Sequence, residues 1–411
     1  MKTLFKEKAI FALLLPVLMI IGCDRNTHVV YQWHGPDRDG IYPGTGLLKI
    51  WPEEGPTLLW KYEGIGNGYS SPTVTADQIF VPGEIDSIGY LFSFDRDGNL
   101  LWKKDIGPEW TKNYPGPRST PTVIDDHVYV ISGMGKLVCL ETSSGKMVWF
   151  KEMMKDLHGR IIRFGISESP LIEGDMVFCF PGGKDTNLVA LNRFNGQLIW
   201  VSPGVGDSTA YCSPSLIRLP DRSILTTFSM HHFIGIDATT GELLWSQKFD
   251  RESDVHCNTP YYEEGFIYLN NRAGNGVTKL QLSVDGSSIK EVWRYFEGGN
   301  VQSGFVKVGD YLYGSRYRPP RYEAIDATTG DVSDSLKFGV GATIFADSLL
   351  YCYGEKGTFG LIKPENGNLE LVSTFKVTEG TKEHFAHPVI YDGTLFIRHG
   401  NTLLAYDIKE N

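Results

Sequence analysis

A four-residue segment recurs along most of this chain and constrains its fold more than any other feature. Its copies stand about 38 to 49 residues apart, and most carry a proline followed by two strand-forming residues. We count eight copies: Ser71-Pro72-Thr73-Val74, Thr120-Pro121-Thr122-Val123, Ser169-Pro170-Leu171-Ile172, Ser213-Pro214-Ser215-Leu216, Thr259-Pro260-Tyr261-Tyr262, Ser303-Gly304-Phe305-Val306, Gly341-Ala342-Thr343-Ile344 and Ala386-His387-Pro388-Val389. A period of this length, built from short strands, is typical of a β-propeller in which each repeat forms one blade.

A second recurring element ends most repeats. It contains a polar residue, then a glycine and then a tryptophan, as in Asp237, Gly241 and Trp245. The aspartate side chain can accept hydrogen bonds within its own turn and the glycine tolerates a positive φ, so the element predicts a β-hairpin. Asp334 stands where the sixth repeat would carry its tryptophan. We expect six tryptophans to be structural, buried where blades dock: Trp60, Trp102, Trp149, Trp200, Trp245 and Trp293.

The two ends of the repeat region complement each other. The last repeat supplies only three strands, ending near Asp407, whereas the strand Thr57–Lys61 precedes the first repeat and has no partner there. Pairing of these ends would complete the last blade and remove its exposed edges. We therefore predict an all-β fold, an eight-bladed β-propeller of four-stranded antiparallel blades that is closed by an N-terminal strand. An open solenoid and two β-sandwiches are the alternatives.

The N-terminus has the pattern of an export signal. Lysines precede the apolar run Ala9–Ile21, which is too short to span a bilayer comfortably and ends just before Cys23. This pattern resembles a bacterial lipobox. We predict a lipoprotein signal peptide over 1–22, a lipidated tether over 23–32 that begins at Cys23, and a single propeller over 33–411. The sequence leaves open the inner or outer membrane, and the periplasm or the cell surface.

The balance of charge and the cysteines narrow the possible functions. The formal net charge is −10, and no long basic run offsets it, so nucleic acid is not an expected partner.

Cys212 and Cys257 fall at nearly equivalent places in successive repeats, and their disulfide state stays open. His231 and His232 are adjacent in a strand and point to opposite faces, so they do not predict a shared metal ion.

The element around Trp245 and the segment Trp33–Gly40 resemble the PQQ-binding-like β-propeller family. This family includes quinoprotein alcohol dehydrogenases and the BamB-like lipoprotein branch. The dehydrogenases use two adjacent cysteines above pyrroloquinoline quinone, with Glu, Asn and Asp around a calcium ion. No two cysteines are adjacent in this sequence, and there is no Cys-x-x-Cys-His for a haem.

The resemblance therefore implies the BamB-like branch. The function expected is a non-catalytic, lipid-anchored binding or assembly module of the bacterial cell envelope. Its expected partners are envelope proteins or a small polar or carbohydrate ligand, and we expect a monomer without cofactor or metal. One alternative is a PQQ- and calcium-dependent alcohol or polyol dehydrogenase. The other is a periplasmic carbohydrate binder.

Candidate ligand-binding residues lie just before the repeated segments. In a propeller these strands line the central channel, so the preceding residues belong at one channel mouth. They are Tyr69, Arg118, Glu168, Tyr211, His256, Asn258, Gln302 and His384. This mixture suits a small polar ligand, and a merely hydrated funnel is the alternative reading. Under the dehydrogenase alternative, Glu168 and Asn258 would bind calcium, and Glu168 or His256 would be the general base.

Overall fold

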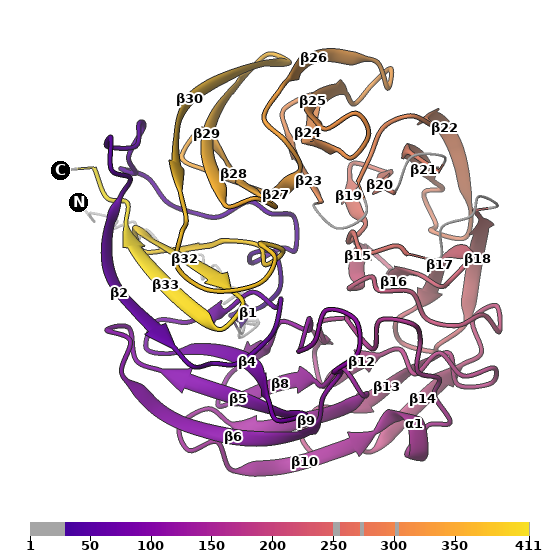
Figure 1. Cartoon of the computed structure of the whole chain (residues 1–411). Coiled ribbons are helices and arrows are strands. Elements are labelled where there is room, and N and C mark those ends of the chain that lie inside the picture. Colours follow the sequence, from indigo (N-terminus) through magenta and orange to yellow (C-terminus); the bar gives the residue numbers. More distant parts are fainter. Residues whose placement is uncertain (1–28, 250–254, 272–274, 301–303, 411) are drawn as a thin grey trace, which may run out of the picture.

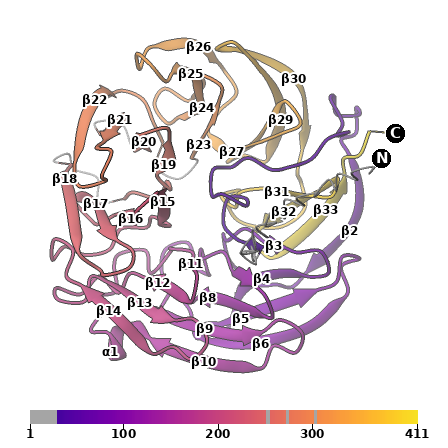
Figure 2. The same cartoon turned by 180° about the vertical axis from the view of Figure 1, so that it is seen from behind.

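The computed structural model describes residues 29–249, 255–271, 275–300 and 304–410. Within these ranges eight antiparallel sheets are arranged as blades around a central channel (Figures 1 and 2). The only helix among the described residues is the single turn α1 (Met153–Asp156), and none there is long and apolar enough to cross a membrane. The predicted eight-bladed, all-β propeller is confirmed.

The first four blades follow one another along the chain, each running from the channel to the rim. Blade 1 consists of β3 (Thr73–Val74), β4 (Ile79–Ile85), β5 (Ile88–Phe94) and β6 (Leu100–Pro108). Blade 2 consists of β7 (Thr122–Ile124), β8 (His127–Ile131), β9 (Lys136–Glu141) and β10 (Met147–Glu152), with β1 (Val30–Tyr31) added beside β7. Blade 3 consists of β11 (Leu171–Glu173), β12 (Met176–Cys179), β13 (Leu188–Asn192) and β14 (Leu198–Ser202). Blade 4 consists of β15 (Ser215–Leu219), β16 (Arg222–Phe228), β17 (His232–Asp237) and β18 (Leu243–Lys248).

The other four blades complete the ring. Blade 5 consists of β19 (Tyr261–Glu263), β20 (Phe266–Asn270), β21 (Val277–Leu282) and β22 (Ile289–Tyr295). Blade 6 consists of β23 (Phe305–Val308), β24 (Tyr311–Arg316), β25 (Arg321–Asp326) and β26 (Val332–Leu336). Blade 7 consists of β27 (Gly341–Ala346), β28 (Leu349–Gly354), β29 (Thr358–Glu365) and β30 (Asn368–Lys376). Blade 8 consists of β31 (Val389–Tyr391), β32 (Thr394–His399), β33 (Thr402–Asp407) and β2 (Thr57–Glu63).

The ring closes inside blade 8, as predicted. Strand β2, from near the N-terminus, pairs antiparallel with β33, and Trp60 lies opposite Ala405 in the register. Figure 1 shows the indigo strand lying against the yellow ones at this seam. Hydrogen bonds between strands distant in sequence therefore hold the circle shut, and no separate clasp is needed.

The hydrophobic core is divided among the interfaces between blades. Both faces of a blade are covered by its neighbours, so its central strands are apolar on both sides. The stretch Val128–Ile131 of β8, for example, is completely buried. One core cluster combines Tyr129 and Ile131 of blade 2 with Val177 and Val189 of blade 3. Each blade is therefore stabilised mainly by packing against the next one.

The tryptophans of the repeat reach across these interfaces. Each of the six indole N–H groups donates to a backbone carbonyl of the following blade, and Trp60 bonds Arg96 O at 2.9 Å. Five of the rings also lie on a glycine of that blade's outer turn, where an added Cβ would meet the ring at 2.6–2.8 Å. These glycines are Gly98, Gly145, Gly196, Gly241 and Gly330.

The interface between blades 6 and 7 uses a different contact. Asp334 stands at the tryptophan position of blade 6, and its Oδ2 accepts the backbone N–H of Leu369 in blade 7 at 2.8 Å. The ring of Tyr311 occupies the space above Gly367, 2.4 Å from where a Cβ would lie. A carboxylate and a tyrosine thus provide the contact that one tryptophan provides elsewhere.

Candidate functional site: the plugged channel and its funnel

The N-terminal segment crosses the central channel before it reaches β2. We call residues 33–42 the plug. Just before it, β1 pairs with β7 of blade 2, within the segment predicted as a tether. In the plug, the indole N–H of Trp33 donates to Thr259 Oγ1 of blade 5 at 2.9 Å. At its end, the N–H of Tyr42 donates to the carbonyl of Phe345 in blade 7 at 2.9 Å. The plug therefore binds blades on several sides of the channel.

Arg38 fixes the middle of the plug. Its guanidinium, which is 4% exposed, donates to the carbonyls of Pro214 at 2.9 Å and Ser169 at 3.4 Å, and also to that of Pro170. Its Nε donates to Gln32 Oε1 at 2.7 Å. Burial lowers the pKa of Arg38 to about 9, so the side chain still carries its charge at neutral pH. A buried, hydrogen-bonded cation thus joins the plug to blades 3 and 4.

Two cavities lie at opposite ends of the plugged channel. The first, which we call the funnel, has a volume of about 440 Å³, and Trp33 of the plug and His387 contribute to its lining. The second has a volume of about 610 Å³ and lies between Val29–Gln32 and the inner strands of blades 8 and 1. In blade 8 the funnel touches Phe385, just before β31, whereas the second cavity touches Val389–Asp392, which contains β31.

A single repeat position forms much of the funnel wall. In six blades the residue three places before the proline of the repeated segment lines the funnel. We call these residues the collar: Tyr69, Arg118, Ser167, Tyr211, Cys257 and Phe385. Because neighbouring residues of an extended segment point to opposite sides, the residues two and four places before the proline face the packed interior instead.

Three of the predicted ligand residues, Tyr69, Arg118 and Tyr211, belong to this collar. The Tyr69 hydroxyl donates to Glu383 Oε2 at 2.6 Å, and burial is the main reason that its pKa is raised. Burial lowers the pKa of Arg118, whose guanidinium donates to the carbonyls of Phe164 at 2.8 Å and Tyr114 at 2.6 Å.

Aromatic side chains follow one another around one side of the funnel. We call them the aromatic belt: Phe385, Tyr69, Tyr114, Phe164 and Tyr211. The ring centroids of Tyr69 and Phe385 are 5.6 Å apart, those of Tyr114 and Phe164 6.3 Å, and those of Phe164 and Tyr211 5.6 Å. The belt spans the interfaces of blades 8 to 4 and presents an apolar wall above the plug.

Glu168 does not line the funnel, although we predicted it from the sequence as a ligand-binding residue. It lies two places before Pro170 and is 3% exposed. Its Oε1 accepts the N–H of Phe180 at 2.8 Å, so it caps the second strand of blade 3. Burial raises its pKa to about 8, and the charge of Arg38 opposes this shift only in part. At neutral pH the carboxyl group is therefore mostly protonated.

His256 and Asn258 are also embedded in the packed interior. His256 contacts Asn271 Oδ1 at 2.9 Å through Nδ1 and stacks on Phe228. The Asn258 amide donates to the carbonyls of Asn270 and Asn300, and its oxygen accepts the N–H of Gly304 at 2.8 Å. These bonds join backbone and side chains of blades 4 to 6, so both residues have structural partners.

His384 and Gln302 are the last two of the predicted ligand-binding residues. The ring of His384 stacks on that of His399 with 3.6 Å between centroids, bonds the Tyr353 hydroxyl, and lies outside the funnel lining. Burial, with the nearby His399 and Lys376, lowers its pKa to about 4. Gln302 lies outside the described residues.

Several residues that line the funnel were not predicted from the sequence. Some of them stand at a fixed position of the repeat and could have been found by it. Counting back three places from every proline would have selected Phe385, Ser167 and Cys257 together with the three residues that were found. Tyr114 and Phe164 come from the long connections between blades, and no repeat position marks them. Trp33 was noted only as part of the opening segment.

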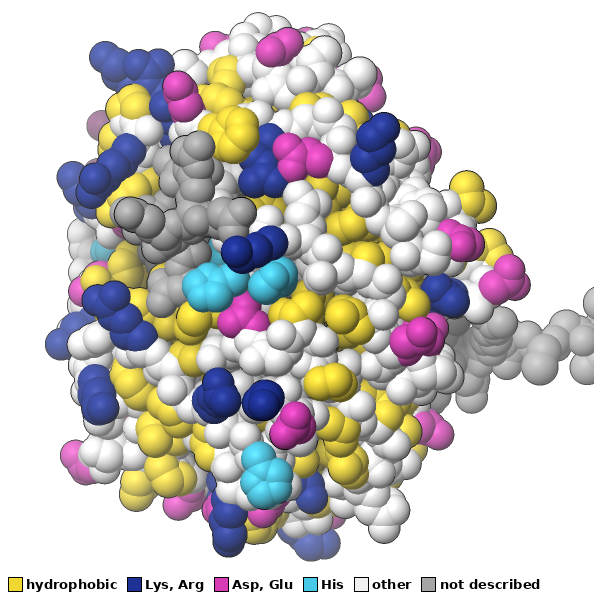
Figure 3. Space-filling view, turned by 90° about the vertical axis from the view of Figure 1, so that its right-hand side faces the viewer, with side chains coloured by type: hydrophobic (Ala, Val, Ile, Leu, Met, Phe, Trp, Pro, Cys, Tyr) yellow, Lys and Arg dark blue, Asp and Glu magenta, His cyan; other side chains and the backbone are white. Residues whose placement is uncertain are grey.

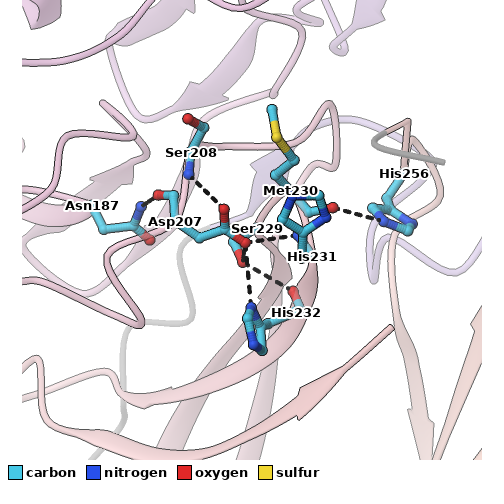
Figure 4. Close-up of polar contacts among 8 residues, drawn as sticks. All are labelled: Asn187, Asp207, Ser208, Ser229, Met230, His231, His232 and His256. Carbon is cyan, nitrogen blue, oxygen red and sulfur yellow. Dashed lines mark hydrogen bonds and ion pairs between the residues drawn. The ribbon is translucent and has the colours of Figure 1, made fainter. Parts of the chain in front are cut away.

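A polar cluster around Asp207 lies between blades 3 and 4 (Figure 4). Asp207 Oδ2 accepts the backbone N–H of His231 at 2.7 Å and the Ser229 hydroxyl at 3.1 Å, and it lies 3.3 Å from His232 Nδ1. Although burial opposes it, these bonds hold the pKa of Asp207 below its usual range. Figure 3 shows histidine, acidic and basic side chains side by side on this flank of the molecule.

The described part of the chain shows neither a metal centre nor a disulfide. It contains no group of three or more His, Cys, Asp and Glu side chains that could hold a metal ion. Cys212 and Cys257 are both free thiols, and burial raises the pKa of each to about 12. Cys212 donates to the carbonyl of Asn258 at 3.3 Å.

These features define a class of protein: a closed eight-bladed β-propeller whose channel is plugged by its own N-terminal segment and opens on one side as a funnel. The family model described as "Outer membrane protein assembly factor BamB" matches residues 87–336. The chain belongs to this family of PQQ-like propellers, which confirms the resemblance inferred from its sequence.

Relatives with the same name are distant. Outer membrane protein assembly factor BamB of Moranella endobia is 24% identical over 311 residues, which are 68% of this chain and 71% of that protein. The corresponding protein of Shewanella oneidensis is 23% identical over 189 residues, 44% of each chain.

Solved structures share the fold. The BamB structure from Moraxella catarrhalis superposes with a TM-score of 0.58 at 13% identity, over 86% of this chain and 99% of that one. A europium-containing methanol dehydrogenase gives a TM-score of 0.53 at 12% identity, over 89% and 88% of the two chains. At these identities the similarity shows the fold and does not decide between an assembly factor and an alcohol dehydrogenase.

Proposed function

We propose that this chain is a non-catalytic, lipid-anchored module that binds envelope proteins during outer-membrane assembly. Membership of a family described as an outer membrane protein assembly factor supports this role. The observation that carries the proposal is the state of the channel. The plug fills it with Trp33 and Arg38, and the residues that a quinoprotein site would need are engaged in structural hydrogen bonds.

The donor set does not fit calcium and pyrroloquinoline quinone. Calcium takes about six to eight oxygen ligands, most effectively charged carboxylates. Glu168 is mostly protonated at neutral pH and accepts a backbone N–H, and the Asn258 oxygen accepts the N–H of Gly304. The adjacent cysteine pair of the dehydrogenases is also missing from the sequence. We therefore derive no oxidation step for this chain.

Exposed apolar side chains on the rim support a protein-binding role. They gather on the outer strands of four consecutive blades, β2, β6, β10 and β14, where strand edges are also unpaired. They are Leu58, Leu59, Leu100, Leu101, Val148, Phe150, Leu198, Ile199 and Val201. An envelope protein that adds an extended strand to this rim would bury them and satisfy the free backbone groups.

The lipid anchor gives the propeller an orientation. Cys23 lies six residues before Val29, and six residues span at most about 20 Å. Val29 lines the second cavity, at the end of the channel opposite the funnel. A diacylated or triacylated Cys23 would hold that end near the membrane surface, so the funnel faces away from the lipid.

Fractionation tests the anchor. The full chain with its own signal should sediment with membranes and release only with detergent, whereas Cys23→Ser should be recovered in the soluble envelope fraction. Mass spectrometry of the detergent extract should show acyl chains on Cys23. An unmodified cysteine in the mature wild-type protein would contradict the anchor.

Cross-linking in intact cells tests the assembly role. The wild-type chain should capture a defined outer-membrane assembly protein, and the double variant Leu100→Glu with Leu101→Glu should lose it. Val284→Glu is the matched control, because Val284 is 98% exposed and lies in blade 5, away from this part of the rim. Equal capture by the rim variant would exclude the rim as the docking surface.

The dehydrogenase alternative has a direct assay. The purified mature chain is loaded with pyrroloquinoline quinone and calcium, and dye reduction is followed with alcohols and polyols. We expect no substrate-dependent reduction. Saturable, alcohol-dependent reduction that is lost in Glu168→Gln would overturn the non-catalytic proposal.

A further inference from the structure

The funnel combines apolar walls with a polar floor. The aromatic belt forms its sides, and Tyr114, 44% exposed, offers its ring most openly. Deeper in the cavity lie Ser169, Ser213, Asn300 and His387, which supply hydroxyl, amide and imidazole groups. A ligand that fits must have apolar faces for the walls and several hydrogen-bonding groups at its edge.

The floor hydroxyls are held in place by the blades. Ser169 Oγ accepts the N–H of Thr120 at 2.9 Å, and Ser213 Oγ accepts the N–H of Ser169 at 3.0 Å. Each bond runs from one blade to the next and fixes the rotamer of the serine. Because an N–H occupies one lone pair, each hydroxyl keeps its own hydrogen to donate. The floor is therefore preorganised before any ligand arrives.

The charge of the funnel favours a neutral ligand. Among the described residues that line it, only Arg118 and Glu355 are charged, and they are of opposite sign. Three backbone carbonyls already accept from the Arg118 guanidinium, those of Asn113, Tyr114 and Phe164. A ligand with several carboxylates would find one cation that is already hydrogen-bonded and a carboxylate nearby, so its desolvation would be poorly compensated.

We propose that the funnel binds a neutral carbohydrate. Sugar rings present C–H groups on their faces and hydroxyls around their edges, which matches the aromatic walls and the floor of this cavity. The volume of about 440 Å³ accommodates about two rings. This site is separate from the rim proposed to bind protein, and it faces the opposite way from the anchor, so a glycan chain can enter it from the envelope space.

Calorimetry with the purified full mature chain tests the proposal. The probes are the neutral disaccharides cellobiose, maltose and chitobiose. At least one should bind saturably, and Tyr114→Ala should weaken that binding roughly tenfold or more because it removes one wall. Phe150→Ala is the matched control: this ring is 49% exposed on β10, outside the funnel, and its removal should leave binding unchanged.

Each result of this calorimetry either supports or overturns the carbohydrate proposal. Absence of heat with all three disaccharides up to about 20 mM would overturn the proposal, as would binding that Tyr114→Ala leaves unchanged. Pyrroloquinoline quinone, an anionic probe, should not bind; tight binding that depends on Tyr114 would show that the site takes anions instead. Protein capture through the rim should persist in Tyr114→Ala, so failure of the carbohydrate proposal leaves the assembly proposal standing.

Discussion

Trp60 of blade 8 lies flat on Gly98 of blade 1. A Cβ added at Gly98 would meet the indole ring at 2.6 Å, and the indole N–H donates to Arg96 O, two residues earlier, at 2.9 Å. The same strand carries the pairing with β33 that closes the ring. One tryptophan therefore ties together the seam of blade 8 and the blade that follows it.

Replacing Gly98 with alanine should destabilise the protein through two separable effects. Gly98 has φ +83°, which strains a residue with a Cβ, and the methyl group would also push into the Trp60 ring. Gly265 is the matched control, because its φ is +85° and nothing lies within 4 Å of its added Cβ.

We expect Gly98→Ala to cost about 1–3 kcal/mol more than Gly265→Ala, measured as the shift in urea unfolding free energy or midpoint. Equal losses in the two variants would mean that backbone strain alone matters at these turns, and that the Trp60 contact adds nothing.

The repeat could be predicted from the sequence because most blades pack against the next blade through the same tryptophan contact. Trp102, Trp149 and Trp200 repeat one hairpin, and the eight copies of the four-residue segment give the number of blades. The junction of blades 6 and 7 could not be read in this way. There, Asp334 and Tyr311 replace the tryptophan contact from different strands, and the pairing becomes visible only when the blades are placed side by side.

The alternation of side chains before each proline gives a labelling prediction. Phe385 lines the funnel, whereas the next residue, Ala386, is 3% exposed. Phe385→Cys should react with a maleimide in the native protein, and Ala386→Cys should react only after unfolding. Burial raises the pKa of the native Cys212 and Cys257 thiols to about 12. Because Cys257 also lines the funnel, the wild-type protein is labelled in parallel and its background is subtracted. Rapid native labelling of Ala386→Cys would contradict the assigned register.

The same alternation explains which site residues the sequence could identify. The repeat fixes each strand position to the residue, and Tyr69, Arg118 and Tyr211 line the funnel in the structure. Their role in binding a ligand stays a prediction. Glu168 and His256 differ from them by only one position relative to the proline, yet they point into the blade interior. Their residue types suggested ligand binding or a general base at those two positions. The direction of the side chain, however, decides whether a ligand can reach it.

Arg38 should hold the plug in the channel. Arg38→Met removes a donor to the carbonyls of Pro214, Ser169 and Pro170, of which Pro170 keeps the Thr122 hydroxyl as a donor. A buried acceptor left without a partner costs roughly 1–3 kcal/mol. We expect faster chymotryptic cleavage after Trp33 in this variant. Arg38→Lys, which keeps the charge but has fewer donors in a fixed geometry, should be intermediate. Unchanged cleavage in Arg38→Met would show that β1 and Trp33 suffice.

Glu168 should make stability fall as pH rises. Its folded pKa is raised to about 8 from an ordinary value near 4.5, so between these values the folded state holds a proton that the unfolded state has lost. The contribution of Glu168 to the unfolding free energy should drop by up to about 1.4 kcal/mol per pH unit over that window.

Glu168→Gln should flatten this part of the profile, because the amide oxygen still accepts the Phe180 N–H and nothing titrates. Urea unfolding at pH 5, 6, 7 and 8 measures the difference between the two slopes. In the variant, Glu109 and Asp39, whose pKa values burial raises to about 7 and about 6, still lower the stability as pH rises. His34 and His384, whose pKa values burial lowers to about 4, act in the opposite direction up to about pH 6.5. Parallel profiles for wild type and variant would show that Glu168 is not the group responsible.

The seam between β2 and β33 also sets an order of events in biogenesis. Its two strands are separated by about 340 residues, so the early strand is synthesised long before its partner exists. The first seven blades can therefore stack while β2 still lacks its partner strand. Completion of the circle is thus a late event in folding, because a chain interrupted before Thr402 leaves β2 without its partner strand.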